Sequence, residues 1–177
     1  CRMESNRPMQ FTDKVVVVTG AASGIGQEIC RLFGRRGARI GLLDREEASV
    51  DRFAEELSGA GVSCVASTAD VRDRAQVSAA IKKISSALGH TDILIPCAGI
   101  CRASTVSNLK VCDVEEILHT NFLGMVYLIE AVLPSMLERE RGQIVGISSL
   151  AGVRGIPFEP AYSASKAAVA AYLESLR

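Results

Sequence analysis

The chain has 177 residues, of which 48% are hydrophobic and 23% are charged, and its 20 basic and 20 acidic residues cancel. This balance is typical of one globular domain with a sizeable core, and it gives no indication of a nucleic-acid or anionic membrane partner. No apolar run approaches the ~20 residues that cross a bilayer, and the N-terminus has no signal-peptide core. We therefore expect a cytoplasmic protein that does not contact membranes.

The ends and the cysteines give two further expectations. The chain opens on Cys1, and we expect residues 1–10 to be a flexible extension before one domain over residues 11–177. It closes at Arg177 inside an expected helix, without a Gly or Pro stop signal, so we expect a fragment. The cysteines form no Cys-x-x-Cys pair and no Cys/His zinc spacing, which indicates free thiols and no metal site.

Apolar periodicity predicts alternating strands and helices. Strands are expected over residues 14–18, 38–43, 62–67, 92–95 and 143–147. Helices are expected over residues 25–36, 46–57, 73–88 and 114–139, and a last helix carries Tyr162 and Lys166. Strands that alternate with helices pair in parallel through right-handed crossovers. The chain is therefore predicted to be an α/β protein with a doubly wound parallel sheet and helices on both faces.

The turn after the first predicted strand is rich in glycine. Residues 19–26 read Thr-Gly-Ala-Ala-Ser-Gly-Ile-Gly and contain Gly20, Gly24 and Gly26. Glycines let the backbone approach a pyrophosphate closely, and the following helix supplies amide donors and partial positive charge. A plain structural turn is the alternative, but the position between strand and helix favours cofactor binding. Ser23 and Ile25 then belong to the same phosphate-binding turn.

Asp44 ends the second predicted strand, about 20 residues after the turn. A carboxylate there can accept both hydroxyls of an adenosine ribose and repels a 2′-phosphate, which favours NAD. Arg45 is the opposing signal, because a guanidinium beside the ribose could accommodate the phosphate of NADP unless it points to solvent. We predict NAD as the cofactor, with NADP possible.

Tyr162 and Lys166 lie four residues apart on a helix and share one face. A neighbouring ammonium stabilises a phenolate and lowers the pKa of a tyrosine from about 10 towards neutrality, which makes the phenol a usable general acid or base. Most such pairs are a solvated lysine beside an ordinary aromatic residue. Ser149 ends a predicted strand, where a lone serine would cap backbone. Beside the Tyr–Lys pair, its hydroxyl can hydrogen-bond a substrate carbonyl or alcohol.

Several motifs together resemble the short-chain dehydrogenase/reductase family, in its order and approximate spacing. They are residues 19–26, Asp70-Val71, Asn121 within residues 120–124, Ile147-Ser-Ser149 and Tyr162-x-x-x-Lys166. The match extends from Phe11 onward and is similar to the single-domain oxidoreductase branch. It implies a Rossmann-type fold whose final strands and substrate-covering loop are missing. The fifth strand would then be an unpaired edge, and cofactor binding would be retained without full activity.

The resemblance also implies catalytic roles. Tyr162 would be the general acid/base, Lys166 would hold the nicotinamide ribose, and Ser149 would orient the reacting oxygen. Asn121 would bend its helix locally and hold a water that relays protons to Lys166. The alternative for Asn121 is a helix-interior residue bonded to its own backbone.

The remaining matched residues belong to the cofactor site. Asp70 and Val71 would flank the adenine, and Ala98 and Gly99 would pass beneath the cofactor. Where the family shows Asn-Asn-Ala-Gly, this chain has Pro-Cys-Ala-Gly at residues 96–99. The family has an asparagine at the position of Cys97, and its side-chain hydrogen bonds are missing here. The sequence does not show which group supports the central sheet at this point.

We therefore predict an NAD(P)-dependent oxidoreductase that transfers a hydride between a nicotinamide and a secondary alcohol or ketone. Residues 156–158, Ile-Pro-Phe, favour a hydrophobic substrate. The alternative is a non-catalytic dinucleotide-sensing or scaffold protein of the same fold. The resemblance also implies a homodimer or homotetramer. The apolar stripe Leu118, Phe122, Met125 and Ile129 fits such an interface, although a stripe of this kind is more often core.

Overall fold

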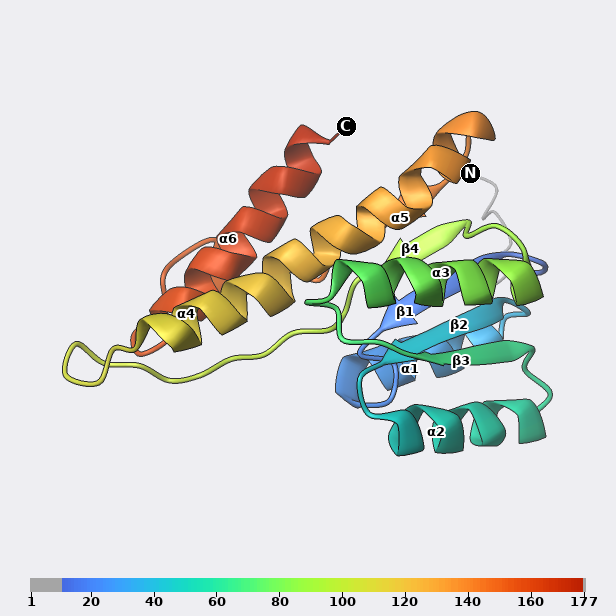
Figure 1. Ribbon diagram of the computed structural model, residues 1–177, viewed down its shortest axis with the longest axis horizontal. Helices are drawn as coiled ribbons and strands as arrows, with labels where there is room; N and C mark the ends of the chain where they lie inside the picture. The colour runs from blue at the N-terminus through green and yellow to red at the C-terminus, as the bar shows by residue number, and fades with distance from the viewer. Residues whose placement is uncertain (1–10, 177) are drawn as a thin grey trace, which may run out of the picture.

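A parallel sheet occupies the centre of the molecule in the computed structural model, which describes residues 11–176 (Figure 1). Its strands are β1 (Val15–Thr19), β2 (Arg39–Asp44), β3 (Cys64–Thr68), β4 (Ile93–Ile95) and β5 (Gln143–Ile144). They pair in the order β3-β2-β1-β4-β5, and each pair is parallel. The N-terminal extension expected over residues 1–10 lies outside the described residues.

Helices cover both faces of the sheet. The helices are α1 (Gly24–Gly34), α2 (Glu47–Gly59), α3 (Arg74–Leu88), α4 (Val111–Leu118), α5 (Gly124–Glu138) and α6 (Pro160–Ser175). α1 and α2 lie against one face, and α3 and α5 against the other (Figure 1). α4 leads into α5 through a π-helical segment, η1 (His119–Leu123), and a 3₁₀ turn, η2 (Leu150–Gly152), precedes α6. The predicted doubly wound α/β fold is confirmed.

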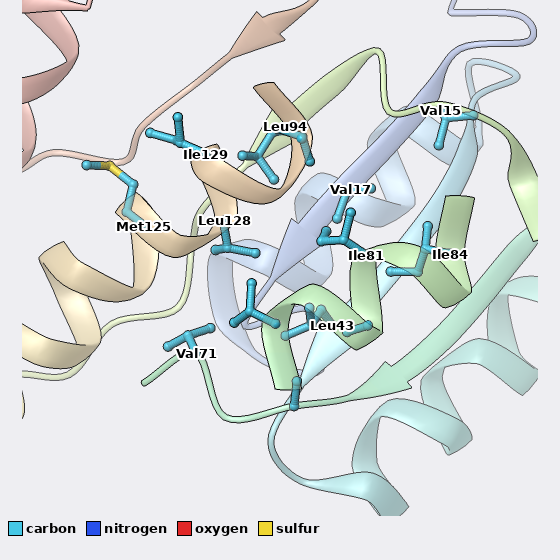
Figure 2. Packing of buried hydrophobic residues seen from close by; sticks show 14 of the residues in the cluster. Val15, Val17, Leu43, Val71, Ile81, Ile84, Leu94, Met125, Leu128 and Ile129 are labelled. Carbon is cyan, nitrogen blue, oxygen red and sulfur yellow. The ribbon is translucent and has the colours of Figure 1, made fainter. Parts of the chain in front are cut away.

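The alternation of side chains along β1 divides the core between the two faces. Val15 and Val17 point into the layer with α3 and α5, whereas Val16 and Val18 point into the layer with α1 and α2. All four side chains are buried. A continuous apolar run suits a sheet that is covered on both faces, because successive residues of a strand face opposite sides. Figure 2 shows the first layer, where Val17 lies near side chains of α3.

Three residues of the apolar stripe on the long helix pack in this core, and Leu118 is half-buried outside it. Met125 and Ile129 are buried in the layer with α3 (Figure 2), and Phe122 meets the ring of Tyr172 edge-on, with centroids 5.7 Å apart. The run Val111–Glu138 is long and apolar enough to cross a membrane by length and composition alone, contrary to the expectation from the sequence. In this fold the run packs against α3 and α6, and 39% of its most apolar window is buried.

Element boundaries differ from the prediction mainly at the fifth strand and the long helix. β5 ends at Ile144 rather than at residue 147, because its partner β4 is short and β5 has a strand on one side only. The long helix begins at Val111 rather than at residue 114. β3 is Cys64–Thr68 rather than residues 62–67. Among residues 11–176 β5 pairs with β4 alone, and a groove of about 850 Å³ lies beside it between the ends of α5 and α6.

The strand order places a crevice at the carboxyl ends of β1 and β4. These strands are neighbours in the sheet, although β2 and β3 lie between them along the chain. β1 leads into α1 on one face, and the chain after β4 leads through α4 to α5 on the other. Open parallel sheets bind ligands at such a point, because the loops diverge there.

Thr19 joins the two strands at this crevice. Its buried Oγ1 accepts hydrogen bonds from the backbone N–H groups of Cys97 (3.2 Å) and Ala98 (3.1 Å). The backbone at Cys97 is therefore supported by a hydroxyl group on the neighbouring strand, in place of the asparagine side chain that the family has there.

Replacing Thr19 with valine keeps the shape of the side chain and removes the acceptor of two amides. A buried donor left without a partner costs about 1–3 kcal/mol, so we expect Thr19→Val to lower the free energy of unfolding by about 2 kcal/mol. Urea unfolding followed by circular dichroism measures the difference. Thr68→Val, at the exposed end of β3, is the control and should change this free energy by about 0.5 kcal/mol at most. Equal losses in both variants would contradict the role of Thr19.

Candidate active site

A cavity of about 530 Å³ opens at the carboxyl ends of the central strands. Every residue predicted to bind a cofactor lines it: Gly20, Ser23, Gly24, Ile25, Gly26, Asp44, Arg45, Asp70, Val71, Ala98, Gly99, Tyr162 and Lys166. The other two candidate catalytic residues, Asn121 and Ser149, are not among its lining residues. The fold thus brings segments that are far apart in the sequence to one cavity.

The glycine turn forms one wall of this cavity, and two of its glycines are sterically required. Gly20 adopts a φ of 63°, and a Cβ there would lie 3.1 Å from the backbone N of Ala98. A Cβ at Gly26 would lie 2.2 Å from the carbonyl oxygen of Gly20, a distance that no real side chain adopts. The absence of side chains therefore lets the turn fold back on itself and brings the start of α1 to the cavity.

The N-terminus of α1 presents free backbone amides. Its N-cap residue, Ser23, makes no side-chain hydrogen bond to the first turn, and that turn contains no acidic residue. The first N–H groups of a helix lack intrahelical partners and carry partial positive charge. Ser23, Gly24 and Ile25 line the cavity. This end of α1 therefore fits the pyrophosphate of a dinucleotide.

Asp44 lies at the end of β2, beside the glycine turn. Its Oδ2 accepts a hydrogen bond from the N–H of Ala22 (3.0 Å), and its Oδ1 accepts one from the N–H of Glu46 (3.3 Å). The carboxylate holds the turn and keeps lone pairs for ribose hydroxyls. Arg45 also lines the cavity, but its side chain is 58% exposed and pairs with Glu46 at 3.4 Å. The preference for NAD over NADP stays a prediction.

Tyr162 and Lys166 lie in the first two turns of α6. Lys166 is only 7% exposed, and its Nζ donates to the backbone carbonyl of Ile147 at 2.7 Å. The ammonium lies 5.7 Å from the centroid of the Tyr162 ring, on the shared face that the spacing predicts. Desolvation lowers the pKa of Lys166 below its ordinary value of 10.5, because burial disfavours the charged form.

Asn121 lies in the π-helical segment, which matches the local distortion implied by the resemblance. Its Oδ1 accepts from the N–H of Ile100 (2.8 Å), and its Nδ2 donates to the carbonyl of Ile100 (2.9 Å) and to Oγ of Ser165 (3.0 Å). The side chain therefore anchors the segment after β4. A Cβ at Gly99 would lie 3.3 Å from Oδ1 of Asn121 and 3.9 Å from Nζ of Lys166, so glycine keeps the space beside these two groups free.

Ser149 is placed differently from the other candidate catalytic residues. Its hydroxyl accepts a hydrogen bond from the N–H of Ala151 (3.1 Å) and caps the 3₁₀ turn η2. Ser149 thus caps backbone, as the alternative for a lone serine expects, although it lies five residues beyond the end of β5. The hydroxyl keeps its own O–H donor, and the role of Ser149 towards a reacting oxygen stays a prediction.

Three groups at this site were not predicted from the sequence. The carbonyl of Ile147 is one, and a backbone group has no signature in a sequence. Ser165 is another, since its hydroxyl donates to the carbonyl of Tyr162 (2.7 Å); its place inside the Tyr-x-x-x-Lys motif could have indicated it. The third is Arg72, whose hydrogen bonds hold the pKa of Asp70 below its usual range. Its position next to the predicted adenine-binding pair was the available signal.

The lowered pKa of Lys166 gives the folded chain a distinct dependence on pH. Between that lowered pKa and 10.5, the unfolded chain binds more protons at this residue than the folded chain does, so the free energy of unfolding rises with pH. We expect the wild-type chain to gain stability relative to Lys166→Met as the pH rises through this window. Urea unfolding from about pH 7 to pH 10.5 measures the difference.

Lys82→Met, on the exposed face of α3, is the matched control for the loss of an ammonium group. The difference in the free energy of unfolding between the wild type and Lys82→Met should rise less over the same pH range than the difference between the wild type and Lys166→Met. The burial of the charged form would be contradicted if the difference in the free energy of unfolding between wild type and Lys166→Met stayed constant or shrank as the pH rises.

Comparison with known proteins shows which family the chain resembles. The profile of the family described as short chain dehydrogenase matches residues 14–177. Dehydrogenase/reductase SDR family member 7B of Rattus norvegicus is 41% identical over 170 residues, which cover 92% of this chain and 52% of that protein.

Two solved structures are similar throughout the described fold. A variant of actinorhodin polyketide ketoreductase with NADPH has a TM-score of 0.89 and 34% identity, covering 95% of this chain and 66% of that one. A short chain dehydrogenase/reductase from Burkholderia phymatum in complex with NAD has a TM-score of 0.91 and 29% identity, covering 95% of this chain and 60% of that one. The chain thus spans 52% to 66% of the length of these relatives. It belongs to the short-chain dehydrogenase/reductase family.

Proposed function

We propose that this chain is the cofactor-binding and catalytic part of an oxidoreductase that transfers a hydride between NAD(P) and a secondary alcohol or ketone. The observation that carries the proposal is that Tyr162 and the buried Lys166 line the same cavity as the glycine turn. A module that only binds a dinucleotide has no need of a phenol and a desolvated ammonium beside it. A related ketoreductase with NADPH and a related enzyme with NAD support the same class.

Different groups of the chain would bind different parts of the cofactor. The free amides of Gly24 and Ile25 at the start of α1 would bind the pyrophosphate. Asp44 would accept the hydroxyls of the adenosine ribose, and Lys166 would donate to the nicotinamide ribose. The nicotinamide, when bound, supplies or accepts the hydride.

The side chains of α6 manage the proton. Tyr162 gives a proton to the carbonyl oxygen of a ketone during reduction and takes one from an alcohol during oxidation. Lys166 has two N–H donors besides the one held by Ile147, and these can face the ribose and the phenol. The space beside Gly99 can hold a water between Asn121 and Lys166, through which the proton of the phenol is replaced.

Replacing Tyr162 with phenylalanine removes the proton donor and leaves the ring. We expect Tyr162→Phe to lower the single-turnover rate of NADH oxidation with hydrophobic ketones by about 100-fold or more, because general acid–base catalysis contributes factors of this size. The affinity for NADH, measured by fluorescence titration, should change by about tenfold at most, since the phenol O–H contributes one hydrogen bond of about 0.5–1.5 kcal/mol.

Tyr172→Phe, on the same helix, is the matched control and should leave both quantities unchanged. A parallel loss of NADH binding and turnover in Tyr162→Phe would contradict the role of the phenol. A wild-type chain that binds NADH and shows no turnover with any ketone or alcohol would favour the dinucleotide-sensing or scaffold alternative.

Replacing Asp44 with asparagine tests the cofactor preference. The amide oxygen still accepts from the N–H of Ala22, while the charge that repels a 2′-phosphate is gone. We expect the ratio of NADPH affinity to NADH affinity to rise by about fivefold or more, which corresponds to roughly 1 kcal/mol of charge repulsion. Fluorescence titration of both cofactors measures the ratio. If the ratio is unchanged, another residue discriminates between NADH and NADPH, and Arg45→Ala is the next variant to test.

The proposed substrate is a hydrophobic alcohol or ketone. The exposed apolar side chains of Ile156 and Phe158, in the segment before α6, support this proposal, and they are 40% and 64% exposed. Assembly as a homodimer or homotetramer and a cytoplasmic location complete the proposal. The long helix, which is apolar enough to cross a membrane by length and composition, packs in this fold against α3 and α6.

A further inference from the structure

One carboxylate ties together two segments that line the cavity. Glu116 of α4 accepts a hydrogen bond on Oε1 from Nη1 of Arg72 (3.2 Å) and one on Oε2 from Nη2 of Arg102 (2.5 Å). Arg72 lies in the turn after β3, and Arg102 lies in the segment after β4. Because β2 and β1 separate these strands, their ends lie about 14 Å apart at ~4.8 Å per strand. Glu116 bridges this separation.

Both arginines have a second carboxylate partner. Arg72 binds Asp70 through Nε (3.0 Å to Oδ1) and Nη2 (2.5 Å to Oδ2), and Nη1 of Arg102 lies 3.6 Å from Asp113. A continuous series of ion pairs therefore runs from Asp70 to Asp113. Each half-exposed pair alone contributes little. Glu116 is the member whose loss breaks the series in the middle, because each of its oxygens serves a different arginine.

The two ends of this series face different parts of the candidate site. Asp70 and Arg72 line the cavity on the side assigned to the adenine. Cys101, next to Arg102, lines it together with Tyr162. Burial and the nearby carboxylate of Glu159 raise the pKa of the Cys101 thiol, which agrees with a place beside the start of α6.

We propose that Glu116 is a positioning residue that couples occupancy of the adenosine half of the cavity to the position of residues 99–102 beside Tyr162. A ligand that orders the turn at Asp70 fixes Arg72, and Arg72 in turn fixes Arg102 through the shared carboxylate. The coupling rests on the proposed function, because it requires a dinucleotide in this cavity. It gives Glu116 a role at the site without contact to the reacting atoms.

Alkylation of Cys101 reports the position of this segment independently of turnover. ADP is the probe, because it carries the adenosine and the pyrophosphate and has no nicotinamide end to cover the thiol. The rate of modification of Cys101 by iodoacetamide, with and without saturating ADP, is followed by peptide mass spectrometry, which resolves Cys101 from Cys97 and Cys112. We expect ADP to slow the reaction in the wild-type chain by about threefold or more.

Two variants break the bridge, and a third is the matched control. Glu116→Gln keeps the size of the side chain and should abolish the effect of ADP on Cys101. Arg102→Gln, at an exposed position whose change leaves the core intact, should abolish it as well. Glu130→Gln removes the exposed partner of Arg74 on α5, away from the cavity, and should preserve the effect. NADH affinity by fluorescence is measured for each chain.

The outcomes separate this inference from the proposed function. Protection by ADP that persists in Glu116→Gln or Arg102→Gln overturns the coupling. Loss of this protection in Glu130→Gln also overturns the coupling. The coupling is likewise overturned if the wild-type chain binds NADH while ADP leaves Cys101 unprotected or accelerates its alkylation. A wild-type chain that binds neither NADH nor ADP overturns the proposed function, and the coupling with it.

Discussion

The hydrogen bond from the buried ammonium of Lys166 to the carbonyl of Ile147 is the interaction on which the candidate site depends. It joins α6 to the chain just after β5 and sets the position of Tyr162 one helical turn earlier. A buried charge is costly without partners, so the ammonium keeps its carbonyl partner, and Lys166 also lines the cavity. The absence of a side chain at Gly99 leaves room beside the ammonium. The proposed chemistry of the site rests on a cation that the fold desolvates and holds in one place.

Backbone groups and one irregular segment build the rest of the cavity. The glycine turn offers amides of α1, and residues 96–102 run past the cavity without regular secondary structure. Such a segment needs partners from side chains, because no neighbouring strand or helical turn satisfies its amides and carbonyls. Thr19 holds the segment at Cys97 and Ala98, Asn121 holds Ile100, and Glu116 holds its last residue by an ion pair. The strand β1, the π-helical segment and α4 each supply one of these anchors.

The parts of the site that follow local rules are predictable from the sequence. An apolar run of valines predicts a strand covered on both faces, glycines between strand and helix predict a phosphate-binding turn, and the spacing of Tyr162 and Lys166 places them on one helical face. The resemblance to the family orders these motifs, and every predicted cofactor-binding residue lines one cavity. Ser149 shows the limit of this reasoning: its hydroxyl accepts the amide of Ala151, a contact that the motif does not indicate, and its role towards a substrate stays a prediction.

The sequence by itself determined the alternation of strands and helices, the two-faced core and the pairing of a phenol with an ammonium, since each depends on residues a few positions apart. Only the tertiary structure decided that Thr19 supports the backbone at Cys97, that β5 is two residues long, and that Glu116 joins segments that follow two separate strands. These contacts depend on the spatial order of the strands, β3-β2-β1-β4-β5, in which β1 and β4 become neighbours across more than 70 intervening residues. Periodicity along a chain carries no information on that order, because it reports which face of an element is buried and not which element covers it.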